Sequence, residues 1–292
     1  MKIKTIVSYS CSKIFGIKLY NKLRFLHKQK RFPNLNSPTT FTEKFLNYKL
    51  SHFDPLMTVC ADKYAVREYV SSKVGSDILI PLIRVFRSVE EFDATFALLP
   101  KSFAMKAAHG SSWNEIVFDK SKVDVLKLKG KVSHWLEMNY YDYGYERQYK
   151  DITPSIVVEE LLVSPEGKVP VDYKFYCFGK GGHKKIIIQV DLDRFDGQHR
   201  RVFYTDDWKK SDIAILSSKT TWELDDYPKP DNLDVMLDIV RRLSEDFDFS
   251  RIDLYNNDGK IYFGEITFHP EAGYGMFIEP KNKDKELLGF FV

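Results

Sequence analysis

Two carboxylates and an arginine stand at regular spacing near the end of the chain. Residues 251–268 alternate polar and apolar side chains on both sides of a turn at 257–259. A three-residue loop at this turn predicts that Glu265 lies opposite Arg251. The predicted polar face of this hairpin consists of Arg251, Asp253, Glu265 and Thr267. The predicted core face consists of Ile252, Leu254, Tyr262, Gly264, Ile266 and Phe268.

Carboxylate oxygens held on rigid backbone suit Mg²⁺, which takes one or two protein carboxylates and completes its shell with water and phosphate oxygens. The polar face of the hairpin is therefore a candidate metal site. A surface salt-bridge patch on a solvated sheet face would have the same composition, so both interpretations remain open.

A second candidate is the loop at 109–114, which joins two predicted strands and contains Ser111 and Ser112. Backbone N–H groups of a small-residue loop can contact phosphate oxygens, and Lys106 on the incoming strand can neutralise their charge. The loop lacks the spacing of a P-loop. An ordinary hairpin turn is the alternative.

Other charged side chains interrupt apolar strands. Glu159 and Glu160 stand in the apolar run 155–163, where a buried strand would not carry them without a reason. Asp172 and Lys174 share one face of a strand that begins an antiparallel meander. The loop that follows contains Arg194, Arg200 and Arg201, which could clamp an acidic substrate or face solvent.

Composition excludes several classes of protein. The 292 residues can form one large domain or two of ordinary size, with 43% hydrophobic residues to fill a core. The net charge of +3, from 44 basic and 41 acidic residues, argues against a nucleic-acid-binding protein. Three widely spaced cysteines fit neither a zinc site nor a disulfide framework, so we expect a reducing, cytoplasmic location.

The regular elements are expected in mixed order. Asp54-Pro55 starts a helix predicted to continue to Gly75, strands are predicted at 78–86 and 102–107, and a helix is predicted at 231–247. The basic N-terminal segment reads as an amphipathic helix, which either packs on its own domain or contacts an anionic membrane surface at the inner face of the membrane.

The motifs as a set resemble the TupA-like branch of the ATP-grasp family, associated with teichuronopeptide and other bacterial surface polysaccharides. The resemblance covers residues 34–292. The segments of this sequence that carry it are NLNSPTTFTEKF, ADKYAVREYV, FAMKAAHGSS, IVVEELL, DYKFYCF, QVDLDRF, RIDLYNNDGKIYFGEITF and HPEAGYGMF. It implies an α+β ATP-grasp fold with ATP bound between antiparallel sheets. The implied parts are a basic helical segment (1–33), an N-terminal α/β part (34–100), a small subdomain with the phosphate loop (101–160) and a large subdomain with the metal site (161–292).

The resemblance also implies roles for residues of this sequence. Lys106, Ser111 and Ser112 would contact ATP phosphates, and Glu159, Glu160, Leu161 and Leu162 would form the adenine hinge. Asp172 and Lys174 would face the nucleotide, Arg251 would stabilise the transferring phosphoryl group, and Asp253, Glu265 and Thr267 would bind Mg²⁺. Thr267 stands where the wider fold has Asn. Lys63 lies in a predicted helix and is a further cation in this set of motifs.

The implied reaction joins a carboxylate to an amine through an acyl-phosphate, with release of ADP and phosphate. A uronic acid of a surface polysaccharide and an amino acid or peptide amine are the expected substrates. Two alternatives remain. Asp191 and Asp193 could be the acidic motif of a metal-dependent glycosyltransferase, and a non-catalytic nucleotide-binding protein would also account for Thr267.

Overall fold

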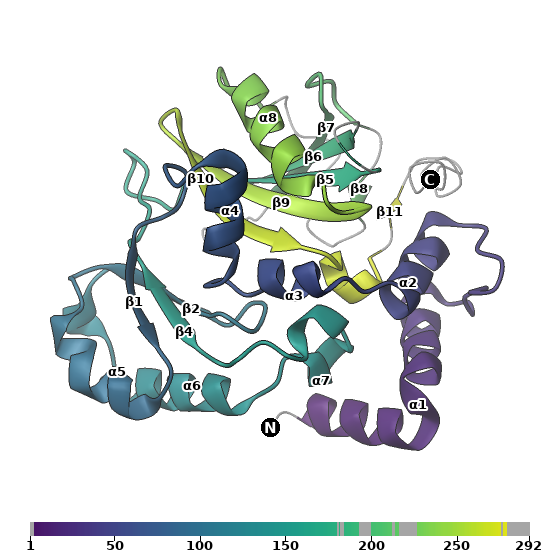
Figure 1. Ribbon diagram of the computed structural model, residues 1–292, viewed down its shortest axis with the longest axis horizontal. Coiled ribbons are helices and arrows are strands. Elements are labelled where there is room, and N and C mark those ends of the chain that lie inside the picture. Colours follow the sequence, from purple (N-terminus) through teal and green to yellow (C-terminus); the bar gives the residue numbers. More distant parts are fainter. Residues whose placement is uncertain are drawn as a thin grey trace. The chain divides into compact units, whose positions relative to one another are not determined.

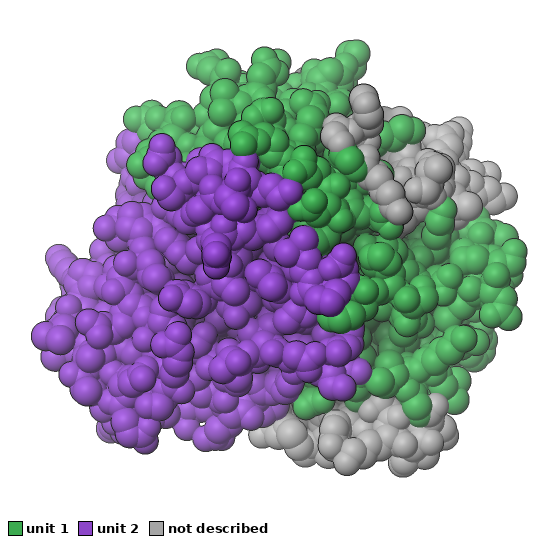
Figure 2. Space-filling model, viewed as in Figure 1, with its two compact units in different colours: residues 1–53, 142–146, 171–292 green, residues 54–141, 147–170 purple. Residues whose placement is uncertain are grey.

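The computed structural model describes residues 3–179, 181, 184–192, 200–211, 214–215, 227–275 and 277–278. These residues divide into two compact units, each with its own antiparallel sheet (Figures 1 and 2). Unit 1 comprises residues 1–53, 142–146 and 171–292, and unit 2 comprises residues 54–141 and 147–170. The domain boundaries expected from the sequence stay predictions.

Unit 1 contains a five-stranded sheet in the order β10-β9-β5-β6-β7. Its strands are β5 (Asp172–Phe178), β6 (Lys185–Leu192), β7 (Arg200–Thr205), β9 (Phe249–Asn257) and β10 (Lys260–Thr267), with a separate pair β8 (Ala214–Ile215) and β11 (Phe277–Ile278). Its helices are α1 (Ile3–Gln29), α2 (Phe41–Ser51), α8 (Leu233–Ser244) and the short η4 (Pro270–Gly273), while α7 (Tyr141–Gly144) crosses the unit boundary.

The two faces of this sheet differ in what covers them. The amphipathic helix α8 packs on β5 and β9 (Figure 1) and buries Met236, Val240 and Leu243, as its spacing predicts. The opposite face is covered at one end by α2, where Phe41 and Phe45 pack in an aromatic cluster with strand residues. The middle of that face carries charged side chains.

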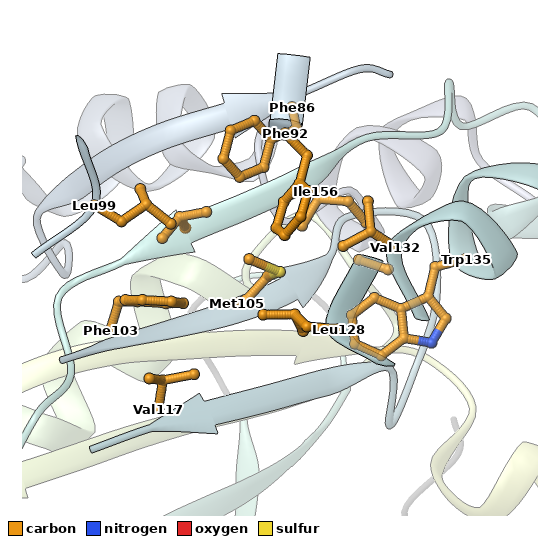
Figure 3. Close-up of a cluster of buried hydrophobic side chains, with 12 residues drawn as sticks. Phe86, Phe92, Leu99, Phe103, Met105, Val117, Leu128, Val132, Trp135 and Ile156 are labelled. Atoms are coloured by element: carbon orange, nitrogen blue, oxygen red, sulfur yellow. The ribbon is translucent and has the colours of Figure 1, made fainter. Parts of the chain in front are cut away.

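Unit 2 contains a four-stranded sheet in the order β1-β4-β2-β3. Its elements are α3 (Pro55–Ala61), α4 (Val66–Val74), β1 (Leu82–Phe86), α5 (Val89–Thr95), η1 (Phe96–Leu98), β2 (Phe103–Ala107), β3 (Asn114–Val117), η2 (Lys120–Lys122), α6 (Val125–Glu137), η3 (Arg147–Tyr149) and β4 (Ile156–Glu159). One face forms the core, where Phe103, Met105 and Ile156 pack against Phe92, Val132 and their neighbours (Figure 3).

The start signals for helices are confirmed, but several predicted bounds are wrong. Asp54 accepts a hydrogen bond from the Leu56 N–H at 2.8 Å and caps α3. The single helix expected up to Gly75 is two helices, because the chain turns at Asp62 and Lys63. The strand expected from Ile78 begins at Leu82, and the strand expected to run to Val163 ends at Glu159.

Candidate functional site

Each unit has its own candidate group of charged residues. We use "charged face" for the first group, on the unit 1 sheet: Asp172, Lys174, Gln189, Asp191, Arg201, Arg251, Asp253, Glu265 and Thr267. We use "Glu159 group" for the second, on the unit 2 sheet: Arg67, Lys106 and Glu159. The charged face is built by side chains that project from the same face of neighbouring strands, whereas the Glu159 group combines side chains of β2 and β4 with Arg67 of α4.

Arg251 is the centre of the charged face. Its Nε donates to Asp253 Oδ1 at 2.6 Å and its Nη2 donates to Asp253 Oδ2 at 2.7 Å. The same Nη2 donates to Glu265 Oε1 at 2.9 Å and to Thr267 Oγ1 at 3.0 Å. The four residues expected to share the polar face of the hairpin therefore meet at one guanidinium group.

The register of the hairpin differs from the prediction. The turn has two residues, Asp258 and Gly259, both with positive φ (52° and 81°), so Lys260 pairs with Asn257. A register shift between Phe263 and Glu265 then inserts one extra residue into β10.

This bulge decides which face Glu265 occupies. The two-residue turn alone would place Glu265 opposite Ile252 on the core face, whereas the extra residue places it opposite Asp253. The expectation that Tyr262 lies on the core face is wrong, because the turn has two residues instead of three. Tyr262 pairs with Tyr255 on the other face, and Phe263 pairs with Leu254 in the core.

Lys174 connects β9 with β5 and β6. Its Nζ donates to Asp172 and, at 2.9 Å, to Asp253 Oδ2, and it lies 3.7 Å from Asp191 Oδ2. Burial lowers the pKa of Lys174, but Asp172 and Asp253 outweigh this effect and the net shift is upward. Lys174 therefore stays charged at neutral pH.

Burial has the opposite consequence for Asp253. It raises the pKa of this carboxyl to about 6, despite the opposing charges of Arg251 and Lys174. The ionised form is therefore held at a cost, which a divalent cation would lower by adding positive charge.

Asp191 was considered in the sequence only as part of a sugar-nucleotide motif. In the structure its Oδ1 accepts from Arg201 Nε at 3.1 Å and from Gln189 Nε2 at 2.7 Å. It thus extends the charged face to β6 and β7. Gln189 and Asp191 lie two residues apart in β6 and therefore share a face, and the strand order places that face beside Lys174.

Of the three arginines expected to clamp a substrate, Arg201 lies on the charged face. Arg200 belongs to β7, and Arg194 lies outside the described residues. Asp193, the second acid of the proposed glycosyltransferase motif, also lies outside them.

Glu159 explains why a glutamate stands in a buried strand of unit 2. Its Oε2 accepts from Lys106 Nζ at 2.8 Å, and its Oε1 accepts from Arg67 Nη1 at 3.1 Å. Arg67 was not recognised in the sequence, although it lies in one of the quoted motifs four residues after Lys63. Glu160 is exposed, and Leu161 and Leu162 are half-buried after the end of β4.

The small-residue loop joins β2 and β3 and is fixed from two sides. His109 is buried, with Nδ1 accepting from the Ser155 N–H at 3.3 Å and Nε2 donating to the Trp135 carbonyl at 2.8 Å. Burial lowers its pKa, so this imidazole is neutral. Ser111 is half-buried, and Ser112 is exposed with a positive φ of 61°.

Lys63 contacts the same loop. It lies in the turn between α3 and α4 instead of inside a helix, is half-buried, and donates from Nζ to the Gly110 carbonyl. Gly110 has no room for a side chain, because a Cβ there would lie 2.5 Å from the Trp113 ring. The loop is thus a tight hairpin turn, and the ammonium group of Lys63 binds its Gly110 carbonyl.

The two antiparallel sheets with helices on their faces are an α+β architecture with charged side chains on the sheets. The family model of TupA-like ATP-grasp proteins matches residues 43–292. The chain therefore belongs to the TupA-like ATP-grasp family, and its fold is the ATP-grasp fold.

Among solved structures, similarity extends to several ligases and synthetases. The D-alanine–D-alanine ligase of Bacillus anthracis in complex with ATP is 13% identical, with a TM-score of 0.44 over 80% of this chain and 63% of that one. The phosphoribosylamine–glycine ligase of Thermotoga maritima is 13% identical, with a TM-score of 0.43 over 75% and 51%. An ADP complex of N5-carboxyaminoimidazole ribonucleotide synthetase is 10% identical, with a TM-score of 0.44 over 78% and 47%.

This chain spans about half to three fifths of the length of these three structures. No match was found among the curated proteins. In the part of the chain that the structure describes, no helix is long and apolar enough to cross a membrane.

Proposed function

We propose that this protein is an ATP- and Mg²⁺-dependent ligase that joins a carboxylate to an amine with release of ADP and phosphate. The observation that carries the proposal is the contact of one guanidinium, that of Arg251, with Asp253, Glu265 and Thr267. Membership of the ATP-grasp family supports it.

The oxygen atoms on the charged face fit a magnesium ion. Asp253 and Glu265 are directly opposite each other on neighbouring strands, and Thr267 Oγ1 lies 3.2 Å from Glu265 Oε1. Hard oxygen donors from one or two carboxylates are what Mg²⁺ takes from proteins. No group of three or more His, Cys, Asp or Glu within the described residues could hold a metal ion, so water and phosphate oxygens would complete the shell.

When bound, magnesium would offset negative charge on the reacting phosphates. Arg251 would contact the transferring phosphoryl group, for which a planar guanidinium with several donors is suited. Lys174, with Asp172 beside it, would face the nucleotide. The buried positions of these side chains keep them fixed before substrate binds, so little reorganisation is needed during the reaction.

In unit 2, Lys106 would contact nucleotide phosphates, and the loop with Ser111 and Ser112 would donate backbone N–H groups to them. The segment 159–162 would contact adenine. After Glu159 the chain leaves the sheet: the Glu160 N–H donates to the Pro81 carbonyl at 3.0 Å, and the half-buried Leu161 and Leu162 would offer their backbone groups to adenine.

A carboxylate is a poor electrophile, and phosphorylation by ATP turns it into an acyl-phosphate. Attack by an amine then forms the amide, releases phosphate and loses one proton from the amine nitrogen. We propose a uronic acid, in a surface polysaccharide or its sugar-nucleotide precursor, as the carboxylate and an amino acid or peptide as the amine. Arg194, Arg200 and Arg201 are proposed to contact the acidic substrate.

The test is incubation with ATP, Mg²⁺, a set of uronic sugar nucleotides and pooled amino acids, followed by mass spectrometry. Formation of ADP together with an amide product supports the ligase. Consumption of a sugar nucleotide without ADP would identify a glycosyltransferase, and no turnover with retained ATP binding would identify a nucleotide-binding protein. Arg251→Ala in the same assay tests whether the charged face carries the reaction.

A further inference from the structure

The N-terminal 33 residues differ in charge from the rest of the chain. They contain nine lysines and arginines and no aspartate or glutamate, whereas residues 34–292 contain 35 basic and 41 acidic residues. The whole excess of positive charge thus lies in this N-terminal segment, because the rest of the chain is net negative. The charged face does not use this segment, so the proposed ligase function leaves it unexplained.

One side of α1 is fixed on unit 1. Gly16, with φ 75° and ψ 156°, interrupts the helix (Figure 1), and the buried residues of its second half are Tyr20, Asn21 and Phe25. Asn21 Oδ1 accepts from Lys49 Nζ at 3.2 Å and from the Tyr274 hydroxyl. Arg24 Nη1 donates to the Tyr143 carbonyl at 3.1 Å. These contacts set the rotation of the helix about its axis.

The other side of the helix is apolar and exposed. Leu19 and Leu23 are 40% and 41% exposed, and each lies two positions from a buried residue, about 200° around the helix. Lys18 and Lys22 stand beside them in the sequence. Because the inward side is fixed, these leucines cannot turn into the core of unit 1. The two interpretations of the N-terminal segment, packing on its own domain and contacting a membrane, are therefore compatible.

We propose that the side of α1 that carries Leu19 and Leu23, with its lysines, docks on an anionic lipid bilayer. Exposed leucines flanked by cations suit the boundary between acyl chains and acidic headgroups. A nucleic acid or an acidic polysaccharide would need the lysines but would leave the leucines in water. The apolar part of the surface thus selects lipid over another polyanion.

Unit 2 also carries two strongly exposed leucines, Leu98 and Leu126, which are exposed by 73% and 81%. Acidic and basic side chains are nearly balanced in the neighbouring sequence: residues 89–102 and 119–131 together contain five acidic and six basic residues, and Lys129 pairs with Asp93. Mixed charge of this kind gives no net attraction to anionic headgroups. Leu98 and Leu126 therefore provide a matched control for exposed leucines without an excess of positive charge.

The experiment measures cosedimentation of the full chain with vesicles. We expect binding to vesicles that contain phosphatidylglycerol, weaker binding at higher salt, and no binding to pure phosphatidylcholine. The double variants Leu19→Gln/Leu23→Gln and Lys18→Gln/Lys22→Gln should each weaken binding about tenfold or more. The control Leu98→Gln/Leu126→Gln should bind like the parent. Melting temperatures check that all variants fold.

A second arm uses DNA and polygalacturonate in place of vesicles. If the leucine variant keeps full vesicle binding while the lysine variant loses binding to all polyanions, the surface recognises a polyanion and the proposal is wrong. Absence of vesicle binding by the parent, or its loss in the control variant, also overturns it. ADP formation without vesicles should be unchanged in the leucine variant, so this test is independent of the ligase assay.

Discussion

The charged face of unit 1 and the Glu159 group of unit 2 have opposite net charge. In the Glu159 group, one carboxylate lies between the two cations Lys106 and Arg67. The charged face has four carboxylates and three cations: Asp172, Asp191, Asp253 and Glu265 with Lys174, Arg201 and Arg251. The Glu159 group thus has a surplus positive charge, and the charged face has a surplus negative charge.

The proposed function accounts for this difference by giving each group a different kind of ligand. A positive surplus attracts phosphate oxygens, whereas a negative surplus attracts a divalent cation. The groups also differ in rigidity. The charged face is fixed by strands on each side, whereas Arg67 comes from a helix and Lys106 is one long flexible side chain.

Removing negative charge from the charged face should have the largest effect on activity. Asp253→Asn and Glu265→Gln keep the shape of the side chains but remove charge, so activity should fall by several orders of magnitude. ADP formation and Mg²⁺-dependent binding of ADP by calorimetry measure this. Both variants should stay folded, because burial disfavours the ionised Asp253, which has a pKa of about 6.

The expected stability of these two variants does not come from relief of repulsion between the carboxylates. Relief of repulsion between the two carboxylates would be the reason if they faced each other alone, but Arg251 lies between them. If both variants melt early and keep their activity, the charges on this face serve the fold and the metal site is ruled out.

Removing one positive charge in unit 2 should have a smaller effect. Lys106→Ala should weaken ATP binding by roughly 10- to 100-fold, since one charge-assisted contact to phosphate is lost. Calorimetry with a non-hydrolysable ATP analogue measures the affinity. Lys131→Ala is the control, because Lys131 forms a half-exposed ion pair with Glu115 in the same unit. Equal affinity in the two variants would make the 109–114 loop an ordinary turn.

Buried carboxylates within unit 1 also contrast. Glu43 accepts from the backbone N–H groups of Asn34 and Thr39, both at 3.0 Å, and pairs with Arg31. Burial alone would raise its pKa, but these donors lower it to about 2. The pKa of Asp253 shifts the other way, so the ionised form of Glu43 stabilises the fold, whereas the ionised form of Asp253 costs stability.

This contrast predicts opposite dependences on pH. The lowered pKa of Glu43 contributes stability that is present above about pH 4.5 and lost as pH falls towards 2. The raised pKa of Asp253 contributes stability that is present below pH 3.8 and lost as pH rises through 6. Glu43→Gln should therefore lower the free energy of unfolding by up to about 3 kcal/mol at pH 7 and by much less near pH 2.

Urea unfolding at several pH values measures this difference. Glu91→Gln is the control, because Glu91 accepts from the Arg87 N–H at 2.7 Å in an equivalent position at the start of α5 but is exposed. The Glu91→Gln variant should lose less than about 1 kcal/mol in the free energy of unfolding. A loss for Glu43→Gln that is the same at both pH values would mean that shape and not charge matters at this position.

Local signals in the sequence predicted much of the fold. Alternation along the chain placed β5, β9 and β10, and the cap Asp54 placed the start of α3, because these signals act over a few residues. The contacts of Asp191 with Arg201 and of Arg67 with Glu159 depend on which strands and helices become neighbours. No local pattern encodes that information.

The hairpin shows how a correct face can follow from a wrong register. A three-residue loop and a two-residue loop followed by a one-residue bulge both add up to three extra residues. Both therefore place Glu265 on the same face of the sheet as Asp253. Only the two-residue loop followed by a bulge places Tyr262 on the face opposite to the core. The sequence signal for it is Gly264, a glycine inside a strand, which is typical of a bulge or a close approach of backbone.

Gly264→Ala should therefore disturb the site through the register. A Cβ at this position would lie 3.0 Å from the Asp253 carbonyl oxygen and 3.3 Å from the Tyr255 ring, and the carbonyl belongs to a paired strand that cannot move freely. We expect a loss of about 1–3 kcal/mol in the free energy of unfolding. ADP formation should fall as well, because Glu265 follows Gly264 directly.

Gly130→Ala is the matched control. Gly130 lies inside α6, and a Cβ there would meet nothing within 4 Å. Alanine favours the helix over glycine, so this variant should gain about 0.5–1 kcal/mol without a change in activity. Urea unfolding and ADP formation measured on both variants separate the steric effect from the general effect of replacing glycine. If Gly264→Ala is as stable and active as the parent, the bulge does not set the position of Glu265.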